Sequence, residues 1–374
     1  SRYKKLKSTL KYRLIDLLFL IDANQAKYQE HQVAFQNCNK YLAAARMLMA
    51  RGAFSSARHL FSKALDISLS NEFTDIAVQC LKNLRNHYGL MEVDWKRYRK
   101  YDKQFKALLK LQQAEMELEE HYILLSRRRI KGRKRRKELH ESATTICEKV
   151  DVLLQQYDSA RLHYHGRLLK VIRYMSVNDY REAGEVCRQA LAFFESKPFR
   201  YRIGISAFAN NLLVCCTQLK QFDEGWTIFS TYSNLYQEGH FNWYNNRQLY
   251  FSLCMHTGRY QEAYQTLSKA VGHPRFTSLP AHDQEKWRIF KAYIHYLVVL
   301  GEVEPETGDK RFNKFRLGRF LNEVPVFSQD KRGYNIPILI VQILFLVLQK
   351  RYQKALDRVE ALDKYCSRYL RKDP

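Results

Sequence analysis

Residues 52–57, with the sequence Gly-Ala-Phe-Ser-Ser-Ala, carry the pattern that decides the fold. A turn precedes an aromatic residue, two polar residues separate it from a small residue, and Phe61, Ala64 and Leu65 follow. Phe61 and Ala64 lie four and seven residues after Ala57, so the three share one face of an α-helix. The stretch predicts a helix that begins directly after a turn and whose small residue lets a neighbouring helix approach closely.

This pattern recurs four times further along the chain. The aromatic and small residues of the copies are Tyr180 and Ala183, Phe222 and Gly225, Tyr260 and Ala263, and Tyr352 and Ala355. Positions 57, 183, 225, 263 and 355 are separated by 126, 42, 38 and 92 residues. These gaps fit one, two or three units of roughly 40 residues. One helix pair cannot bury its apolar faces alone, so the recurrence predicts pairs that stack on one another.

Proline placement and apolar spacing both indicate an all-α fold. No proline precedes Pro198, and the later prolines lie near expected helix ends. Apolar residues at spacings of three and four are common, whereas the alternation that is typical of strands is scarce. The sequence therefore predicts an all-α protein.

The recurring pattern resembles the second helix of tetratricopeptide repeats (TPRs). The first-helix signature is weaker, because its small residue is kept as Ala45 but is replaced by Val171, Leu213, Phe251 and Ile343 in later units. The units are also longer than the 34 residues of the family. The resemblance implies an α-solenoid of TPR-like helix pairs, some of them degenerate. Residues 324–333, Val-Pro-Val-Phe-Ser-Gln-Asp-Lys-Arg-Gly, also resemble uncharacterised bacterial helical-repeat proteins, a likeness that implies no activity.

The segment 95–157 departs from the repeat. Two stripes with spacings of three and four are Gln104, Leu108, Leu111, Glu115, Leu118, Tyr122 and Leu125, and then Leu139, Ala143, Ile146, Val150, Leu153 and Tyr157. Two such stripes joined by a short connection predict an antiparallel helical hairpin. The expected organisation is therefore TPR-like helical pairs over 1–94, a basic helical hairpin over 95–157, and a TPR-like array over 158–374.

Positive charge concentrates at this hairpin. The chain has 63 Lys and Arg against 38 Asp and Glu, a net charge of +25. Nine basic residues and no acidic ones lie in 127–137: Arg127, Arg128, Arg129, Lys131, Arg133, Lys134, Arg135, Arg136 and Lys137. Seven more basic residues lie on the first hairpin helix: Lys96, Arg97, Arg99, Lys100, Lys103, Lys106 and Lys110. A second basic cluster, with Arg2, Lys4, Lys5, Lys7, Lys11 and Arg13, lies near residue 1.

Three interpretations fit the basic hairpin. It can bind nucleic acid through phosphate contacts, because arginine donates two parallel hydrogen bonds to phosphate oxygens. It can bind another polyanion, either a membrane surface or an acidic protein. Alternatively, it is a solvated loop whose first arginines favour the C-terminal dipole of the preceding helix. Residues 127–137 contain no aromatic side chain, so base stacking is not expected there.

A peptide groove is the second candidate site. The first helices of TPR pairs line a concave surface, and the resemblance places Asn210, Asn211, Asn245 and Gln248 on it. Side-chain amides suit this task because each can donate to and accept from a peptide backbone. Arg247 joins them because it ends the aromatic and asparagine-rich stretch 241–247, and aromatics and arginine are typical of binding hot spots. Alternatively, Trp243 and Tyr244 are core residues, and the asparagines cap the helix or face solvent.

Enzyme chemistry is not indicated. Phosphate-binding, nucleophile-elbow and metalloprotease motifs are absent from the sequence, and His163 and His165 are too closely spaced to share a metal on one helix face. The eight cysteines form no CxxC pair, which favours reduced thiols in a cytoplasmic protein. The longest apolar run, 336–348, is too short to span a bilayer. We therefore expect no catalytic residue, cofactor, metal site or transmembrane segment.

The leading functional hypothesis is a non-enzymatic binding scaffold or adaptor that recruits a protein or peptide through the helical-repeat groove. The first alternative is a nucleic-acid-binding protein that uses the basic hairpin 95–137. The second is a peptide-sensing regulator, which would use the same groove. Because the two surfaces are separate, recruitment through the groove does not exclude binding through the hairpin.

Overall fold

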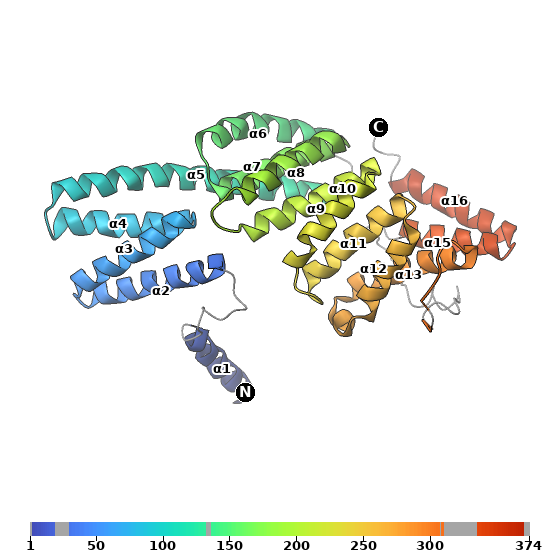
Figure 1. Ribbon diagram of the computed structural model, residues 1–374, viewed down its shortest axis with the longest axis horizontal. Coiled ribbons are helices and arrows are strands. Elements are labelled where there is room, and N and C mark those ends of the chain that lie inside the picture. The colour runs from blue at the N-terminus through green and yellow to red at the C-terminus, as the bar shows by residue number, and fades with distance from the viewer. Residues whose placement is uncertain (1, 19–29, 132–135, 307, 310–334, 370–374) are drawn as a thin grey trace. The chain divides into compact units, whose positions relative to one another are not determined.

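The computed structural model describes residues 2–18, 30–131, 136–306, 308–309 and 335–369. Within these ranges the chain forms fifteen α-helices, two short 3₁₀-helices and no strand (Figure 1). The prediction of an all-α protein is confirmed for this part of the chain. None of the helices described is long and apolar enough to span a membrane. The resemblance at 324–333 lies outside the described residues.

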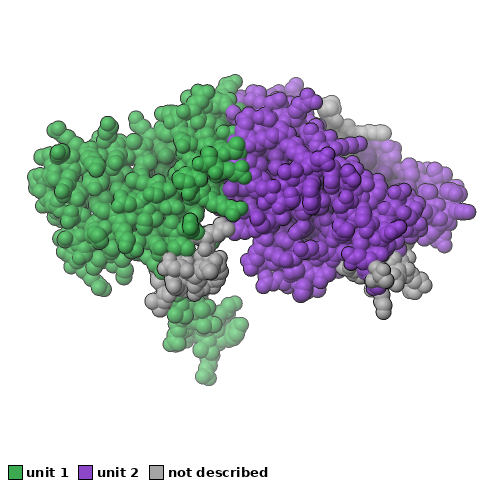
Figure 2. Space-filling view, in the orientation of Figure 1, with its two compact units in different colours: residues 1–124, 146–169, 192–201 green, residues 125–145, 170–191, 202–374 purple. Residues whose placement is uncertain are grey.

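The chain divides into two compact units, which Figure 2 shows in different colours. Unit 1 comprises residues 1–124, 146–169 and 192–201, and unit 2 comprises residues 125–145, 170–191 and 202–374. Each unit is therefore assembled from segments that are distant in the sequence. The division into three parts at residues 94 and 157 stays a prediction.

Unit 1 is built on the helices of the N-terminal half. It contains α1 (Arg2–Leu18), α2 (Glu30–Ala50), α3 (Phe54–Ser70), α4 (Thr74–Leu90), the first thirty residues of α5 (Trp95–Lys131), the second half of α6 (Arg136–Gln156), part of α7 (Ala160–Ser176) and the end of α8 (Tyr180–Glu195). Small buried residues, Ala45, Ala57 and Ala64, allow α2 and α3 to pack closely. Phe61 and Leu81 fill the space between them and α4.

Unit 2 contains the later helices, each packed against the next in chain order. These are α9 (Arg202–Leu219), α10 (Phe222–Tyr232), α11 (Phe241–His256), α12 (Tyr260–Gly272), α13 (Ala281–Leu300), α15 (Asn335–Leu348) and α16 (Tyr352–Tyr369), with 3₁₀-helices at Ser233–Leu235 and Pro274–Ser278. In addition, α9 packs directly against α11. Each helix thereby buries one face on its predecessor and another on its successor.

Five turns repeat one backbone conformation. The residue two places before each repeat aromatic has positive φ: Gly52 (77°), Asn178 (60°), Lys220 (57°), Gly258 (74°) and Lys350 (57°). In all five turns the next amide donates to the carbonyl five residues earlier, at 2.9–3.0 Å. This is the left-handed helix cap that satisfies the last carbonyls of a helix. The five small residues that follow are all buried, as the sequence predicts.

The predicted hairpin helices form, with one correction in register. The first, α5, runs without interruption for 37 residues, about 55 Å at 1.5 Å per residue. An ion pair between Glu117 of α5 and Lys149 of α6 joins them, and Leu118 and Val150 are fully buried. The second stripe is wrong at one of its members, because Cys147 rather than Ile146 is fully buried. Leu139, Ala143 and Val150 of the same stripe are buried as predicted.

Candidate functional site

An open pocket of about 500 Å³ lies between α11 and α13 in unit 2. We refer to it as the α11–α13 pocket. Its lining comprises Gln248, Phe251, Ser252, Met255 and His256 of α11, Lys286, Ile289, Phe290 and Tyr293 of α13, and Pro337 of α15. Lining residues on each helix recur at spacings of three or four, so each helix presents one face to the pocket. Gln248 is the predicted groove residue that lies here.

The pocket combines an apolar wall with hydrogen-bonding groups. The rings of Phe251 and Phe290 stack at 4.3 Å between centroids, and the Tyr293 hydroxyl donates to the Pro337 carbonyl at 3.2 Å. Ser252 donates to the Gln248 backbone carbonyl at 3.0 Å, and the Gln248 side-chain amide itself makes no hydrogen bond in the described part of the chain. An apolar cleft with a few oriented polar groups is the usual form of a ligand site.

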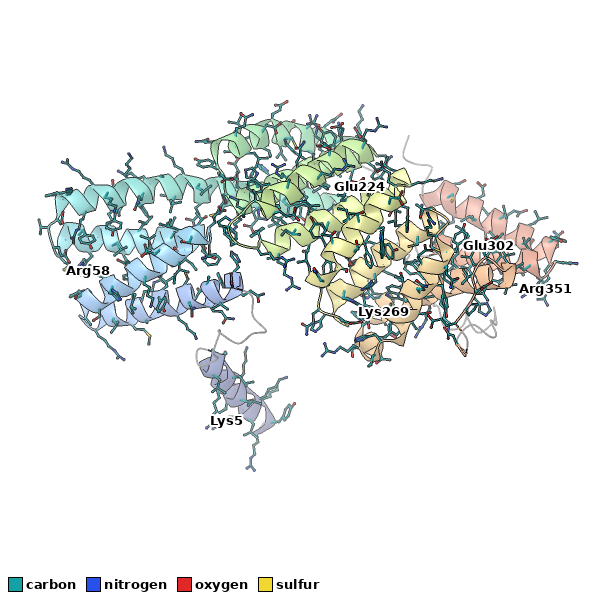
Figure 3. The ribbon with its side chains drawn as sticks, viewed as in Figure 1. Lys5, Arg58, Glu224, Lys269, Glu302 and Arg351 are labelled. Atoms are coloured by element: carbon teal, nitrogen blue, oxygen red, sulfur yellow. The ribbon has the colours of Figure 1, made fainter. Side chains whose placement is uncertain are left out.

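A second, more polar pocket of about 550 Å³ adjoins the first at His256. It is formed by the turn before α10 and the turn before α12, and it is lined by Lys220, Gln221, Phe222, Asp223, Glu224, His256, Thr257 and Arg259. Glu224 (labelled in Figure 3) accepts two hydrogen bonds from Arg188, at 2.7 and 3.1 Å, and this contact raises the pKa of the Arg188 guanidinium. His256 is the residue that lines both pockets.

The other predicted groove residues lie outside the lining of the α11–α13 pocket. Asn210 accepts a hydrogen bond from the side-chain amide of Asn246 at 3.1 Å, and Asn211 donates to the Ala207 carbonyl of its own helix at 2.8 Å. Asn245 is exposed on α11. Of the predicted amides, Gln248 is therefore the one that the structure brings to the pocket, and the peptide contacts of the other three stay predictions.

Arg247 is held by aromatic rings. Its guanidinium lies over Phe229 at 4.7 Å and over Trp243 at 5.2 Å from the ring centroids. Burial lowers the pKa of Arg247, and its Nε has no hydrogen-bond partner among the described residues. Trp243 itself is buried. These contacts pack Arg247 between α10 and α11. Trp243 and Tyr244 are core residues, as the alternative interpretation of the stretch 241–247 predicts, whereas Asn246 is buried rather than exposed to solvent.

The centre of the predicted basic site at 127–137 lies outside the described residues. Arg133, Lys134 and Arg135 are not described, and for Arg128, Arg129, Lys131 and Arg136 the backbone is helical but the side chains are not described. Arg127 and Lys137 are exposed. Phosphate binding at this segment therefore stays a prediction.

The seven basic residues of α5 between 96 and 110 fall into two groups. Arg97 pairs with Glu92 and Asp94, and Lys106 pairs with Asp102 at 2.7 Å. The remaining five are exposed and form no ion pair within the described part of the chain; they are Lys96, Arg99, Lys100, Lys103 and Lys110. We call these five residues the α5 basic row. Uncompensated charge on this helix is the condition that favours an anionic partner.

Two buried polar networks of unit 1 were not found from the sequence. Glu115 is fully buried and accepts hydrogen bonds from Thr74 at 2.9 Å and Ser159 at 2.5 Å. Burial raises the pKa of Glu115. Lys197 donates to Glu72 and to the Asp158 carbonyl, both at 2.7 Å. The sequence marks the Glu115 network in one way, because Glu115 is a polar residue inside an otherwise apolar stripe. No local pattern marks the network of Lys197.

Four of the buried cysteines share one electrostatic property. Burial raises the pKa values of Cys38, Cys80, Cys216 and Cys254 to about 12, so their reactive thiolate forms are disfavoured. His, Cys, Asp and Glu residues form no group suited to a metal ion within the described ranges. Glu115 lines neither of the two pockets above.

Comparisons of the chain with known protein families, with curated proteins and with solved structures found no match. The function of the chain is therefore inferred from its pockets, its charged surfaces and its repeated turns.

Proposed function

We propose that the chain is a non-enzymatic binding scaffold that takes up an extended peptide segment in the α11–α13 pocket. The observation that carries this proposal is the placement of the free Gln248 amide beside an aromatic wall. An amide can donate to and accept from one peptide group at the same time, while Phe251 and Phe290 offer apolar contact to a neighbouring side chain. The second pocket, which shares His256 with the first, lies next to this site and offers polar groups to the continuation of an extended ligand.

The same proposal includes a TPR-like α-solenoid architecture. Five turns with one hydrogen-bond pattern and one conformation support a repeated unit, as do the buried small residues that follow them. Packing of each helix of unit 2 against the next supports a stacked array. In such an array, stability depends on neighbouring contacts, and the exposed helix faces are free to bind a partner.

A selection experiment tests the proposal. Peptides of twelve random residues are selected for binding to the purified chain, and the dissociation constants of the selected peptides are measured by fluorescence anisotropy. We expect Gln248→Ala to weaken binding about tenfold, because loss of one partner of a buried hydrogen bond costs about 1–3 kcal/mol. Met255→Asp, which places a charge against the apolar wall, should abolish binding.

Gln265→Ala is the matched control. Gln265 is exposed on the neighbouring helix α12 and does not line the pocket. This variant should bind the selected peptides as the unmodified chain does. If Gln248→Ala and Met255→Asp both bind the selected peptides as tightly as the unmodified chain does, the pocket is not the peptide site. Weakening by Asn211→Ala and Asn245→Ala instead would favour the groove expected from the TPR register. A peptide-sensing regulator would use the same pocket and would also change oligomeric state or protection when peptide binds.

A further inference from the structure

The turn between α4 and α5 exposes four large apolar side chains. The exposed fractions are 77% for Leu90, 57% for Met91, 64% for Val93 and 60% for Trp95. We call these four residues the apolar tip. Figure 1 shows the turn at the end of the α4–α5 pair, where the chain reverses direction. Large apolar residues that are exposed together on a surface mark a contact with another molecule.

Val93 has an unfavourable backbone conformation in addition to its exposure. Its φ is 51°, in the left-handed region where a β-branched residue is a genuine outlier. Glycine or asparagine would form this turn at lower cost. An exposed valine therefore gains nothing from burial and destabilises the turn. A strained residue that the fold does not need is evidence that its side chain serves a function.

The apolar tip is held rigidly from beneath. Tyr88 is buried and stacks on Tyr101 at 5.3 Å between ring centroids. Gly89 lies so close to Tyr98 that an added Cβ would come within 2.9 Å of the ring. The Asp94 carboxylate accepts the Arg97 amide at 2.9 Å and caps the start of α5. Because the turn is already ordered, its apolar side chains can bind without a further loss of backbone entropy.

The acidic groups of the turn are neutralised. Glu92 contacts His87 at 2.9 Å, Arg58 at 3.5 Å and Arg97 at 3.6 Å. Asp94 contacts Arg97 at 3.4 Å. Arg58, on α3, is labelled in Figure 3. With both carboxylates engaged by cations, the turn does not repel an anionic surface.

The α5 basic row begins directly behind the apolar tip. Lys96 follows Trp95 in the sequence, and Arg99 lies one helical turn after Trp95. At 100° per residue, the five cations share an arc of about 100° on one side of α5. Lys96 and Lys110 are fourteen residues apart, which is about 21 Å along the axis. A row of cations beside exposed apolar side chains is the composition of a surface that lies at a lipid interface.

We propose that the apolar tip and the α5 basic row together dock on an anionic lipid membrane. The tip inserts Trp95, Val93 and the neighbouring side chains among the headgroups, and the basic row contacts lipid phosphates. This is a surface contact and needs no membrane-spanning helix. The aliphatic members of the tip favour lipid over nucleic acid, because nucleic-acid bases stack on aromatic rings rather than on leucine, methionine or valine.

Vesicle co-sedimentation tests the charge requirement. The full chain is mixed with phosphatidylcholine vesicles that contain 30% phosphatidylserine, and separately with pure phosphatidylcholine vesicles. We expect binding to the anionic vesicles, weakening as salt rises. The variant Lys96→Gln/Lys100→Gln/Lys103→Gln should lower the partition coefficient roughly a hundredfold, at about fivefold per cation. The matched control, Arg351→Gln/Lys354→Gln/Arg358→Gln, lies directly before and within α16, removes the same charge from exposed residues of unit 2 and should retain tight binding.

Trp95 reports insertion directly. Trp226 is the other exposed tryptophan, since Trp243 and Trp287 are buried, so the measurement uses a Trp226→Phe background. Brominated lipids should quench the Trp95 fluorescence when vesicles bind. Because α1 also carries exposed apolar and basic residues but no tryptophan, it can add to vesicle binding without adding to this signal.

Val93→Asn separates a membrane role from a structural one. Asparagine adopts the left-handed conformation more readily, so this variant should unfold at higher temperature than the unmodified chain and yet bind anionic vesicles about tenfold more weakly. Equal binding to neutral and anionic vesicles, or binding without quenching of Trp95, would overturn the proposal. So would RNA binding that depends on the basic row with no vesicle binding at all.

Discussion

A substitution at Gly225 tests whether close packing between neighbouring helices is the reason for the small residue in the repeat. It occupies in α10 the position that alanine occupies in the other four copies. An added Cβ would overlap Leu253 Cδ2 of α11 and would lie 3.3 Å from Cys216 Cβ of α9. Leu253 and Cys216 are both fully buried, so neither neighbour can move into solvent. The α10 copy is therefore too tightly packed for the alanine that the pattern otherwise prefers.

Two opposing contributions decide the effect of Gly225→Ala. Alanine in a helix interior is favoured over glycine by about 1 kcal/mol. Overpacking a filled core costs about 1–3 kcal/mol. We expect a net loss of about 1 kcal/mol in the free energy of unfolding. Gly184 is the matched control, because it is also a buried helical glycine, but its added Cβ would lie 3.6 Å from both Cys215 and Leu212, at ordinary contact distance. Gly184→Ala should therefore stabilise by about 1 kcal/mol.

Urea unfolding, followed by circular dichroism, measures both variants. A double-mutant cycle with Leu253→Ala then isolates the clash. Once the leucine is removed, Gly225→Ala should stabilise the chain rather than destabilise it, so the coupling free energy should be about 2 kcal/mol. Stabilisation by Gly225→Ala in the unmodified chain, equal to that of Gly184→Ala, would refute the claim that Leu253 packs against this position.

Three further predictions concern buried ionisable groups of unit 1. Burial raises the pKa of Glu115, so its ionisation destabilises the fold once the pH rises above the ordinary pKa of a glutamate. Glu115→Gln removes this effect. Between pH 4 and pH 8 the variant should therefore gain about 1 kcal/mol in the free energy of unfolding relative to the unmodified chain, measured in urea titrations. Burial lowers the pKa of His163 to about 4, so the free energy of unfolding should fall by at most about 3 kcal/mol from pH 6.5 to pH 4, and His163→Phe should flatten this slope. Lys197→Met should cost about 2 kcal/mol because the partly buried Glu72 carboxylate then keeps the Ala160 amide as a partner but loses its cation. Lys269→Met removes the cation of the exposed pair with Glu238 and should cost less than about 0.5 kcal/mol in the same assay; Lys269 is labelled in Figure 3.

Local patterns were sufficient to predict the helices and the repeated turns. The aromatic and small residues of each copy mark a helix start, because turn geometry and close packing both depend on residues within a few positions of one another. In the stripe at 139–157, the sequence predicts Ile146 as a buried residue, but the next residue, Cys147, is the one that is buried. Cys147 and Ile146 are both apolar, so the sequence alone could not decide which of the two faces the neighbouring helices.

The candidate site could be predicted only in part, because it depends on contacts between distant residues. Gln248 was placed by repeat register and does line the α11–α13 pocket, but its opposite wall comes from α13, which carries no clear copy of the pattern. Asn210 was assigned by the same reasoning, yet its side chain is engaged by Asn246. Lys197 lies 125 residues from its partner Glu72, a separation at which no local pattern signals contact.

Backbone conformation at the remaining non-glycine turns shows why Val93 stands apart. Glu72 has φ of 54°, and its carboxylate accepts hydrogen bonds from the Lys197 ammonium and from the Ala160 amide at 2.6 Å. Its strained turn therefore positions a buried ion pair. Asn178 belongs to a residue type that tolerates the left-handed region, and it accepts a hydrogen bond from the Tyr180 hydroxyl at 3.3 Å.

Lys220 and Lys350 follow helix ends, where a cation is favoured by the negative end of the helix dipole. Glu72 and Asn178 thus each gain side-chain hydrogen bonds within the chain, and the two lysines carry the charge that a helix end favours. Val93 has no polar group to hydrogen-bond, no charge to meet the dipole, and 64% of its surface in solvent. The turn itself serves the chain, because the Asp94 amide donates to the Tyr88 carbonyl at 2.9 Å, but glycine or asparagine would form it at lower cost. The proposed contact with lipid, beside a row of cations, would account for a valine at this position.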